Sequence, residues 1–244
     1  MPAGPTTLTQ EDRLDSNTTW IDIPGPDGTF QAYQALPRGG KGPGIVLIQE
    51  IFGVNAHIRS VAEQFAADGY VVLAPDLFWR QGAHIELGYD DADWNKAVAL
   101  KGATDTGKAV ADVAATIGVL RGLEGVQKVA SVGFCFGGLL SYLAAAAGNV
   151  DAAVAYYGGG IQNQLDKADA VNVPLLMHFG GKDSHIPADA VKSIAERFGE
   201  RDNVEIHVYT EAEHGFNCSH RGSYHQRSSA EARGNTLLFL SENL

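Results

Sequence analysis

The sequence predicts a single α/β domain in which a mostly parallel central sheet carries helices on both faces. From residue 45 onward, short apolar runs typical of strands alternate with helical patterns, and such alternation favours a parallel sheet covered on both sides. Residues 45–48 are apolar throughout, as in a strand buried on both faces. A chain of 244 residues can bury one large core. We assign the domain to residues 18–244 and residues 1–17 to a flexible N-terminal tail.

The first part of the chain predicts a β-hairpin and the start of the sheet. Residues 18–23 and 29–35 alternate in polarity around the turn signal Pro24–Gly28. Further elements are expected as a strand at 45–48, a helix at 57–67 and a strand at 70–74. Residues 79–104 show no regular period, and we expect a short helix and loops there, over one end of the sheet.

The rest of the chain continues the alternation of strands and helices. A helix at 106–120 precedes a strand that ends at Val132 and a helix at 139–147. The remaining predicted elements are strands at 152–157, 174–179 and 204–209 and helices at 188–198 and 226–240. A glycine-rich loop is expected between the strands at 152–157 and 174–179.

Composition narrows the possible partners and location. A net charge of −11 argues against a nucleic-acid or anionic-membrane partner. The N-terminus lacks the pattern of a secretory signal, and the longest apolar stretch, 139–147, is too short to cross a bilayer. Cys135 and Cys218 cannot form a disulfide framework, and a working free thiol suits a reducing compartment. We therefore expect a cytoplasmic protein, either a monomer or a small homo-oligomer.

Residues 129–138 carry the main chemical signal. The pattern Gly133-x-Cys135-x-Gly137 is a cysteine version of the nucleophile elbow, a tight turn between a strand and a helix. The two glycines avoid a collision across this turn. The N-terminus of the following helix offers free N–H groups, which favour a thiolate and later an oxyanion. A lone cysteine in apolar surroundings is often inert core, but its place between two glycines favours a nucleophile.

Two later residues are candidate partners of the thiol. Asp183 and His214 each follow a predicted strand, and functional residues of parallel sheets lie beyond the carboxyl ends of the strands. The order Cys135, Asp183, His214 is the order of nucleophile, acid and histidine in α/β-hydrolases. Taken alone, Asp183 could cap the helix that follows, and His214 could be an ordinary loop histidine.

Glu50 is a fourth candidate, because it follows the buried strand at 45–48 and should emerge at the same edge of the sheet as Cys135. The alternative for Glu50 is a carboxylate paired with an arginine. The backbone N–H groups of Ile51 and Phe136 are the candidate oxyanion donors.

A zinc site is a competing interpretation of the C-terminal region. Its candidate ligands are His214, Cys218, His220 and His225, with His207 as a further candidate. Their spacing matches no common structural zinc pattern, and a metal would occupy the histidine that the thiol needs. We therefore expect no metal, and Cys218 to be a bystander or a pocket-lining thiol. The glycine runs at 158–160 and 180–181 do not support nucleotide binding.

Taken together, these residues resemble the dienelactone hydrolase (carboxymethylenebutenolidase) family. The matching stretches are Gln49–Asn55, Pro75–Leu77, Gly133–Gly138, Tyr156–Gly158, Gly180–Asp183 and His214–Phe216. The resemblance implies an α/β-hydrolase fold with little or no cap domain, a Cys135–His214–Asp183 triad, and no metal or organic cofactor. It also implies that Glu50 holds the resting thiol and takes its proton when an anionic substrate binds.

The chain departs from the family where the substrate carboxylate is bound. The best-known members use two arginines, and the aligned positions here are Leu87 and Cys218. The cations that could replace them are Arg80, Arg221 and Arg227. A buried carboxylate without a partner is costly, so either another cation reaches the pocket or the substrate is not dienelactone. The expected substrate-binding residues are Phe52, Trp94, Tyr157, Arg80 and Cys218.

The sequence thus predicts a cofactor-free hydrolase that cleaves a small ester or lactone through an acyl-thioenzyme. One alternative is a carboxylesterase of the same family that acts on a different small or aryl ester. A second is a non-catalytic homologue that binds a ligand or senses thiol oxidation.

Overall fold

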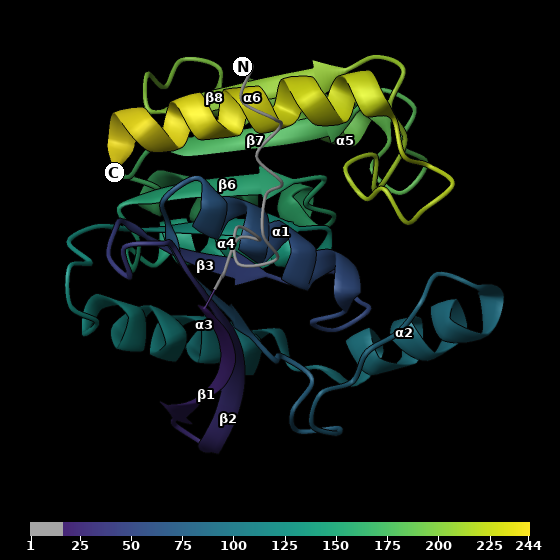
Figure 1. Cartoon of the computed structure of the whole chain (residues 1–244). Helices are drawn as coiled ribbons and strands as arrows, with labels where there is room; N and C mark the ends of the chain where they lie inside the picture. Colours follow the sequence, from purple (N-terminus) through teal and green to yellow (C-terminus); the bar gives the residue numbers. More distant parts are fainter. Residues whose placement is uncertain (1–16) are drawn as a thin grey trace, which may run out of the picture.

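The computed structural model describes residues 17–244, so most of the predicted tail lies outside the described residues. Its centre is an eight-stranded sheet of order β1-β2-β4-β3-β5-β6-β7-β8 (Figure 1). The strands are β1 (Asn17–Gly25), β2 (Gly28–Leu36), β3 (Gly44–Ile48), β4 (Val71–Pro75), β5 (Val129–Phe134), β6 (Ala152–Tyr156), β7 (Leu175–Gly180) and β8 (Val204–Tyr209). From β3 to β8 all neighbours are parallel, which confirms the predicted sheet type.

The N-terminal hairpin forms the antiparallel edge of the sheet. β1 pairs with β2, and β2 pairs antiparallel with β4. Asn17, which we assigned to the tail, instead begins β1, because its pairing with Leu36 extends the hairpin ladder.

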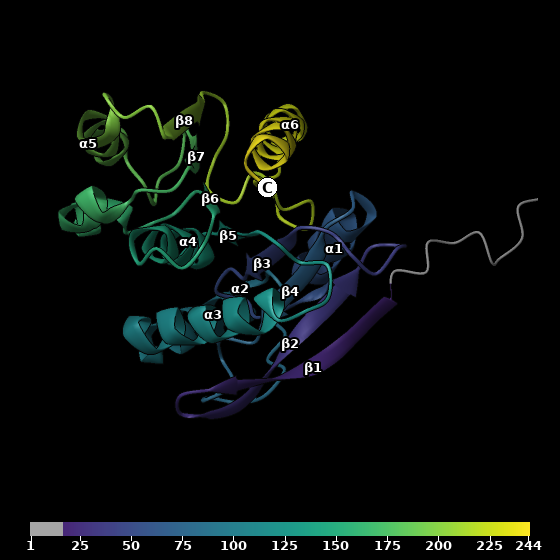
Figure 2. The same ribbon diagram turned by 90° about the vertical axis from the view of Figure 1, so that its left-hand side faces the viewer.

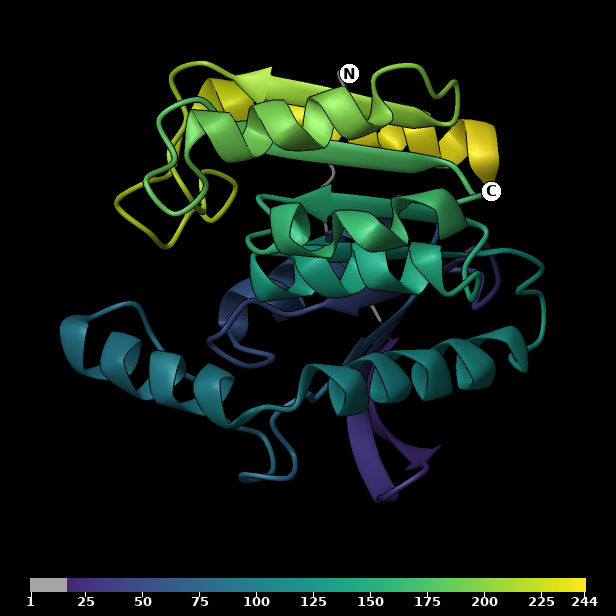
Figure 3. The same ribbon diagram turned by 180° about the vertical axis from the view of Figure 1, so that it is seen from behind.

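Helices cover both faces of the sheet, as predicted. They are α1 (Ala56–Ala67), α2 (Asp91–Ala103), α3 (Thr106–Arg121), α4 (Phe136–Ala146), α5 (Ala188–Phe198), α6 (Gln226–Asn243) and the 3₁₀ segment η2 (Ile161–Ala170). Figure 2 shows α1 and α6 on one face and α3, α4 and α5 on the other. Figure 3 shows this second layer, together with η2, from behind. α1 turns Ile58, Val61 and Phe65 toward the core, the spacing of an amphipathic helix.

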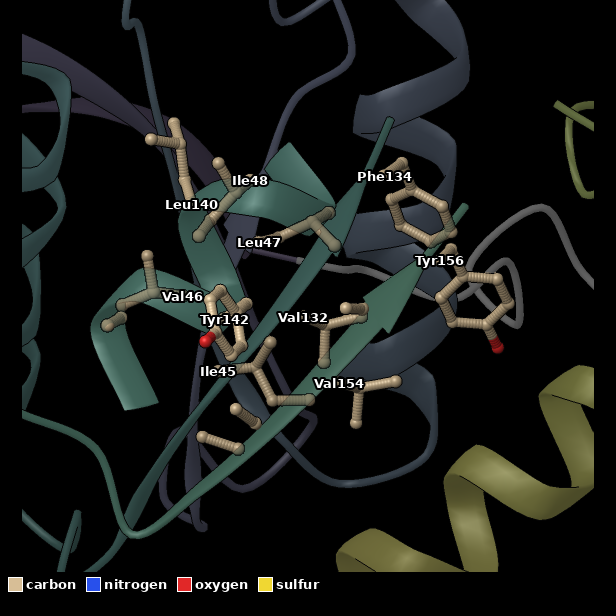
Figure 4. Close-up of a cluster of buried hydrophobic side chains, with 14 of the residues drawn as sticks. Ile45, Val46, Leu47, Ile48, Val132, Phe134, Leu140, Tyr142, Val154 and Tyr156 are labelled. Atoms are coloured by element: carbon tan, nitrogen blue, oxygen red, sulfur yellow. The ribbon is translucent and has the colours of Figure 1, made fainter. Parts of the chain in front are cut away.

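The core lies between the central strands and these helices (Figure 4). Every residue of β3, β5 and β6 is buried. The side chains drawn in Figure 4 include Val46, Val132 and Val154 on these three strands and Leu140 and Tyr142 on α4. This packing fixes the strand ends from which the candidate site residues project.

The turn between β5 and α4 is shorter than predicted. β5 continues to Phe134 and α4 begins at Phe136, so Cys135 alone joins them. The early start of α4 is hidden in the sequence because glycine disfavours helices. Gly137 is nevertheless required there, since a Cβ at this position would lie 2.3 Å from the carbonyl oxygen of Ile48.

Two other segments differ in detail from the prediction. The expected short helix within residues 79–104 is α2, which lies on the right of Figure 1, past the ends of the strands. Within α2, Ala97 is the buried residue, which explains the weak apolar period. η2 falls in the expected glycine-rich loop, and the non-helical backbone at Gln164 interrupts its period. Over the described range 17–244, no helix combines the length and apolarity needed to cross a bilayer.

Candidate active site

Cys135 sits on a strained turn at the carboxyl end of β5. Its φ of 54° and ψ of −113° are unusual for a residue other than glycine. The turn is tight enough that a Cβ on Gly133 would lie 1.9 Å from the carbonyl oxygen of Gly137. The elbow geometry predicted for this segment is therefore present. The Cys135 side chain is partly exposed rather than sealed in the core, and its thiol is free.

Asp183 and His214 converge with Cys135. His214 Nδ1 lies 2.7 Å from Asp183 Oδ2, and the Cys135 sulfur is near enough for its charge to act on the imidazole. The other carboxylate oxygen of Asp183 accepts N–H groups of His185 and Ile186 at 2.8 and 3.1 Å. Both carboxylate oxygens of Asp183 thus form hydrogen bonds, and this fixes the orientation of the His214 ring. The N-cap residue of α5 is Pro187, so Asp183 is not the cap of that helix.

The charge environment favours an imidazolium at His214. Burial by itself would lower the pKa of His214, but the charge of the nearby Cys135 sulfur and the hydrogen bond to the Asp183 carboxylate raise it from 6.5 to about 10. An imidazole that holds its proton this strongly stabilises a neighbouring thiolate.

Glu50 and Arg221 form a buried ion pair beside this group. Glu50 Oε1 lies 3.2 Å from Arg221 Nη1, and the two side chains are 1% and 13% exposed. Burial raises the pKa of Glu50, while the charge of Arg221 opposes that rise. Glu50 Oε2 is buried and has no hydrogen-bond partner among the described residues. A buried acceptor without a partner is costly. Glu50 Oε2 can therefore take up a proton or accept a hydrogen bond.

Arg221 owes its position to its neighbours. Its guanidinium lies 5.6 Å from the ring centre of Phe52 and 5.7 Å from that of Tyr89. A Cβ on Gly215, whose φ is +76°, would lie 2.3 Å from Arg221 Nη1. Burial by itself would lower the pKa of Arg221, but the nearby charge of Glu50, together with weaker contributions from other groups around it, raises it. The sequence named Arg221 only as one of three possible cations.

Aromatic side chains border an adjoining cavity of about 320 Å³. Phe52, Tyr89 and Trp94 line it together with Arg221. The Tyr89 hydroxyl accepts a hydrogen bond from the Asn55 side chain at 3.1 Å, which orients the ring. Tyr89 was missed because it lies in the irregular stretch between β4 and α2. The cavity therefore has an aromatic wall opposite a polar loop, residues 220–223, that carries the guanidinium.

Comparison with known proteins places the chain in a family. The sequence pattern of the dienelactone hydrolase family matches residues 30–244. A carboxymethylenebutenolidase of Pseudomonas putida is 38% identical over 227 residues, 92% of this chain and 96% of that protein. The chain belongs to the dienelactone hydrolase family. The predicted resemblance is confirmed, and with it the assignment to dienelactone hydrolase-like carboxylic ester hydrolases.

Solved structures agree with this family assignment. A Klebsiella pneumoniae protein provisionally named a dienelactone hydrolase has a TM-score of 0.80 at 30% identity, covering 92% of this chain and 98% of that one. A serine hydrolase without a lid from Xanthomonas campestris has a TM-score of 0.64 at 16% identity, covering 98% and 97% of the two chains. At that identity the likeness bears on the fold alone. The α/β-hydrolase fold predicted for the chain is confirmed.

Tyr157, one of the predicted substrate-binding residues, lies beside the triad, and the two positions of the family's arginines are buried. The ring centre of Tyr157 is 5.1 Å from that of His214. Its φ is +37°, and its buried hydroxyl has no partner among the described residues. Leu87 is buried, and its N–H donates to the carbonyl oxygen of Phe52. Cys218 is also buried, and burial raises its pKa to about 11.

Arg80 is not brought to the site. Its guanidinium pairs with Asp112 at 2.5 Å and with Asp27 at 3.1 Å, and it lines a different cavity. Asp112 is fully buried, so this pair has a structural partner that the sequence pattern did not reveal. We therefore withdraw Arg80 as a substrate ligand. Arg227 pairs with Glu231 on the exposed surface of α6.

The zinc cluster considered from the sequence does not assemble as a unit. His214 is hydrogen-bonded to Asp183 and lies beside Cys135. His225 caps α6 by accepting the N–H of Ser228. His207 pairs with Glu205 on β8. Cys218 and His220 do lie close together, but with His57 rather than with the other expected ligands.

Proposed function

We propose that this dienelactone hydrolase family member cleaves a small ester or lactone through an acyl-thioenzyme on Cys135. The observation that carries the proposal is the hydrogen bond of His214 to Asp183 at 2.7 Å, beside a free Cys135 thiol on a strained elbow at the end of β5. A nucleophile, a proton carrier and an orienting carboxylate in this order are the requirements of acyl transfer.

The reaction has two steps. The Cys135 sulfur attacks the carbonyl carbon, and the electron pair of the C=O bond moves onto oxygen. The ester C–O bond then breaks, and His214 gives its proton to the leaving oxygen. In the second step His214 takes a proton from water, whose oxygen attacks the thioester and releases the acid and the thiolate.

Backbone N–H groups at the elbow supply the oxyanion site. Phe136 is the first residue of α4, so its N–H has no acceptor within the helix. Ile51 follows Glu50 in the turn after β3, the position of the second donor in this fold. We propose that both N–H groups stabilise the negative charge on the tetrahedral intermediate.

Glu50 and Arg221 make activation depend on the substrate. An incoming carboxylate competes with Glu50 for the guanidinium of Arg221. The carboxylate of Glu50 is then left without its counterion, its affinity for a proton rises, and its free Oε2 takes the proton of the resting Cys135 thiol, which becomes the thiolate. This is the gating role that the family resemblance implies, with Arg221 as the cation that responds to the substrate.

We infer an anionic, compact substrate, because the aromatic cavity holds a buried guanidinium. A neutral or aryl ester is the second candidate, favoured by the uncharged Leu87 and Cys218 at the family's two arginine positions. Hydrolysis of either the anionic or the neutral substrate by this triad needs no metal and no organic cofactor. A free thiolate requires reducing conditions, which suits the cytoplasm.

Matched substrates test the proposal. The kcat/KM values of dienelactone and of its methyl ester are measured beside that of p-nitrophenyl acetate. We expect the free carboxylate to be preferred over its ester. Activity on p-nitrophenyl acetate without activity on dienelactone supports the neutral-ester candidate. Iodoacetamide labelling of Cys135 without any turnover contradicts both hydrolytic functions and supports a thiol sensor.

A further inference from the structure

Three metal-ligating side chains meet beside the proposed active site without taking part in its chemistry. His57, Cys218 and His220 offer one nitrogen or sulfur atom each, and these atoms lie within 4.8 Å of one another. His57 belongs to the first turn of α1, whereas Cys218 and His220 lie in the loop between β8 and α6. The group therefore joins two elements that are distant in the sequence.

The buried members of this group are prepared to bind a cation. His57 is 4% exposed, and its Nε2 has no hydrogen-bond partner among the described residues. A buried imidazole nitrogen without a partner is costly, and a metal ion would satisfy it. Cys218 is buried, and its backbone is held by a hydrogen bond from its N–H to the carbonyl oxygen of Gly215 and by one from the N–H of Arg221 to its own carbonyl oxygen. Such outer contacts orient a thiolate ligand on its metal.

We propose that His57, Cys218 and His220 bind one Zn²⁺ ion. Two imidazoles and one thiolate form a donor set that suits this borderline-soft cation, with a fourth position left for water. Binding transfers the Cys218 proton to solvent and forms the metal–sulfur bond. In a tetrahedral site with ordinary zinc bond lengths the donors are about 3.3 to 3.6 Å apart. His220 is exposed and can turn to close the remaining distance.

The position of the site gives it access and a connection to the catalytic loop. His57 lines one cavity, of about 160 Å³, and His220 lines the neighbouring cavity that contains Arg221. The negative charge of Glu50 offsets the positive charge of Arg221, which reduces the repulsion between the guanidinium and the ion. A bound ion would tie α1 to the loop that carries Arg221.

Cobalt titration of the full-length protein tests the site. Cys135→Ala is used as background, because it leaves Cys218 as the single thiol of the chain. We expect Co²⁺ to give a thiolate-to-cobalt charge-transfer band that saturates at one ion per chain and that Zn²⁺ abolishes. In the same background Zn²⁺ should raise the Tm.

Ligand variants provide the comparison. His57→Phe and His220→Ala should each weaken binding about tenfold or more, and Cys218→Ser should remove the band. His84→Asn is the matched control: this exposed histidine stacks on Trp20, and asparagine tolerates its positive φ. Absence of the band in Cys135→Ala, or a band unchanged by both His57→Phe and His220→Ala, overturns the proposal. Because His220 is exposed, its variant remains informative even if Cys218→Ser does not fold.

Discussion

Arg221 Nη1 lies 3.2 Å from Glu50 Oε1, and both side chains are almost fully withdrawn from solvent. An ion pair in this environment is strongly coupled, because removing one partner leaves an uncompensated buried charge. Arg221 sits in the cavity that we propose for the substrate, so a ligand can perturb Glu50 by engaging its counterion.

Replacing Arg221 by methionine removes the proposed carboxylate ligand. We expect Arg221→Met to raise KM for the carboxylate substrate much more than for its methyl ester. The ratio of kcat/KM for the carboxylate to that for the ester should therefore fall. It should also destabilise the fold by about 3 to 5 kcal/mol, since Glu50 loses its partner. Arg227→Met, which removes an exposed guanidinium on α6, is the control. Equal effects on the two substrates would remove Arg221 from substrate recognition.

Glu50→Gln tests the gating of the thiol. Burial raises the pKa of Glu50 above its ordinary value of 4.5. Glu50 accepts a proton only when it is ionised, so kcat/KM of the wild type should fall as the pH drops through this raised pKa. In Glu50→Gln the activity should be lower and this acidic limb should vanish. A pH–rate profile identical to that of the wild type would refute the gating role.

Gly215→Ala should displace Arg221, whose guanidinium occupies the space of the added Cβ. The added Cβ would lie 2.3 Å from Arg221 Nη1, and a φ of +76° is strained for alanine. We expect a loss of preference for the anionic substrate similar to that of Arg221→Met. Gly222→Ala is the matched control in the same loop, because nothing lies within 4 Å of its Cβ position. If both glycine variants keep the wild-type substrate preference, the fit between Gly215 and Arg221 does not matter for function.

Asp183→Asn should uncouple His214 from its orienting group. The amide cannot replace both the bond to His214 Nδ1 and the two backbone N–H contacts at Oδ1. By analogy with other triads we expect kcat to fall by about 10³-fold while KM changes little. Asp189→Asn, near the start of α5, serves as the control. A kcat within a few-fold of the wild type would show that His214 works without Asp183.

The sequence is informative where local geometry restricts the choice of residue. Gly133 and Gly137 are required by backbone contacts across the elbow, so their spacing around Cys135 is enough to indicate the turn. Asp183 and His214 follow parallel strands, and the carboxyl ends of such strands meet at one edge. The type of sheet and its covering helices could be predicted for the same reason.

Long-range pairing of charges could not be predicted. Arg80 and Arg221 look alike in the sequence, yet one pairs with Asp112 on α3 and the other with Glu50 after β3. Which arginine reaches the cavity depends on loop paths that have no periodic signal. The proximity of His57 to Cys218 has the same origin, because the packing of α1 beside a distant loop brings them together.

The most direct test of the central claim is peptide-resolved mass spectrometry of the protein quenched during turnover of dienelactone. We expect one ring-opened acyl group per chain on Cys135, and neither adduct nor turnover in Cys135→Ala. Turnover that persists in Cys135→Ala, or an acyl group found on Cys218 instead, would contradict the assignment of Cys135 as the nucleophile.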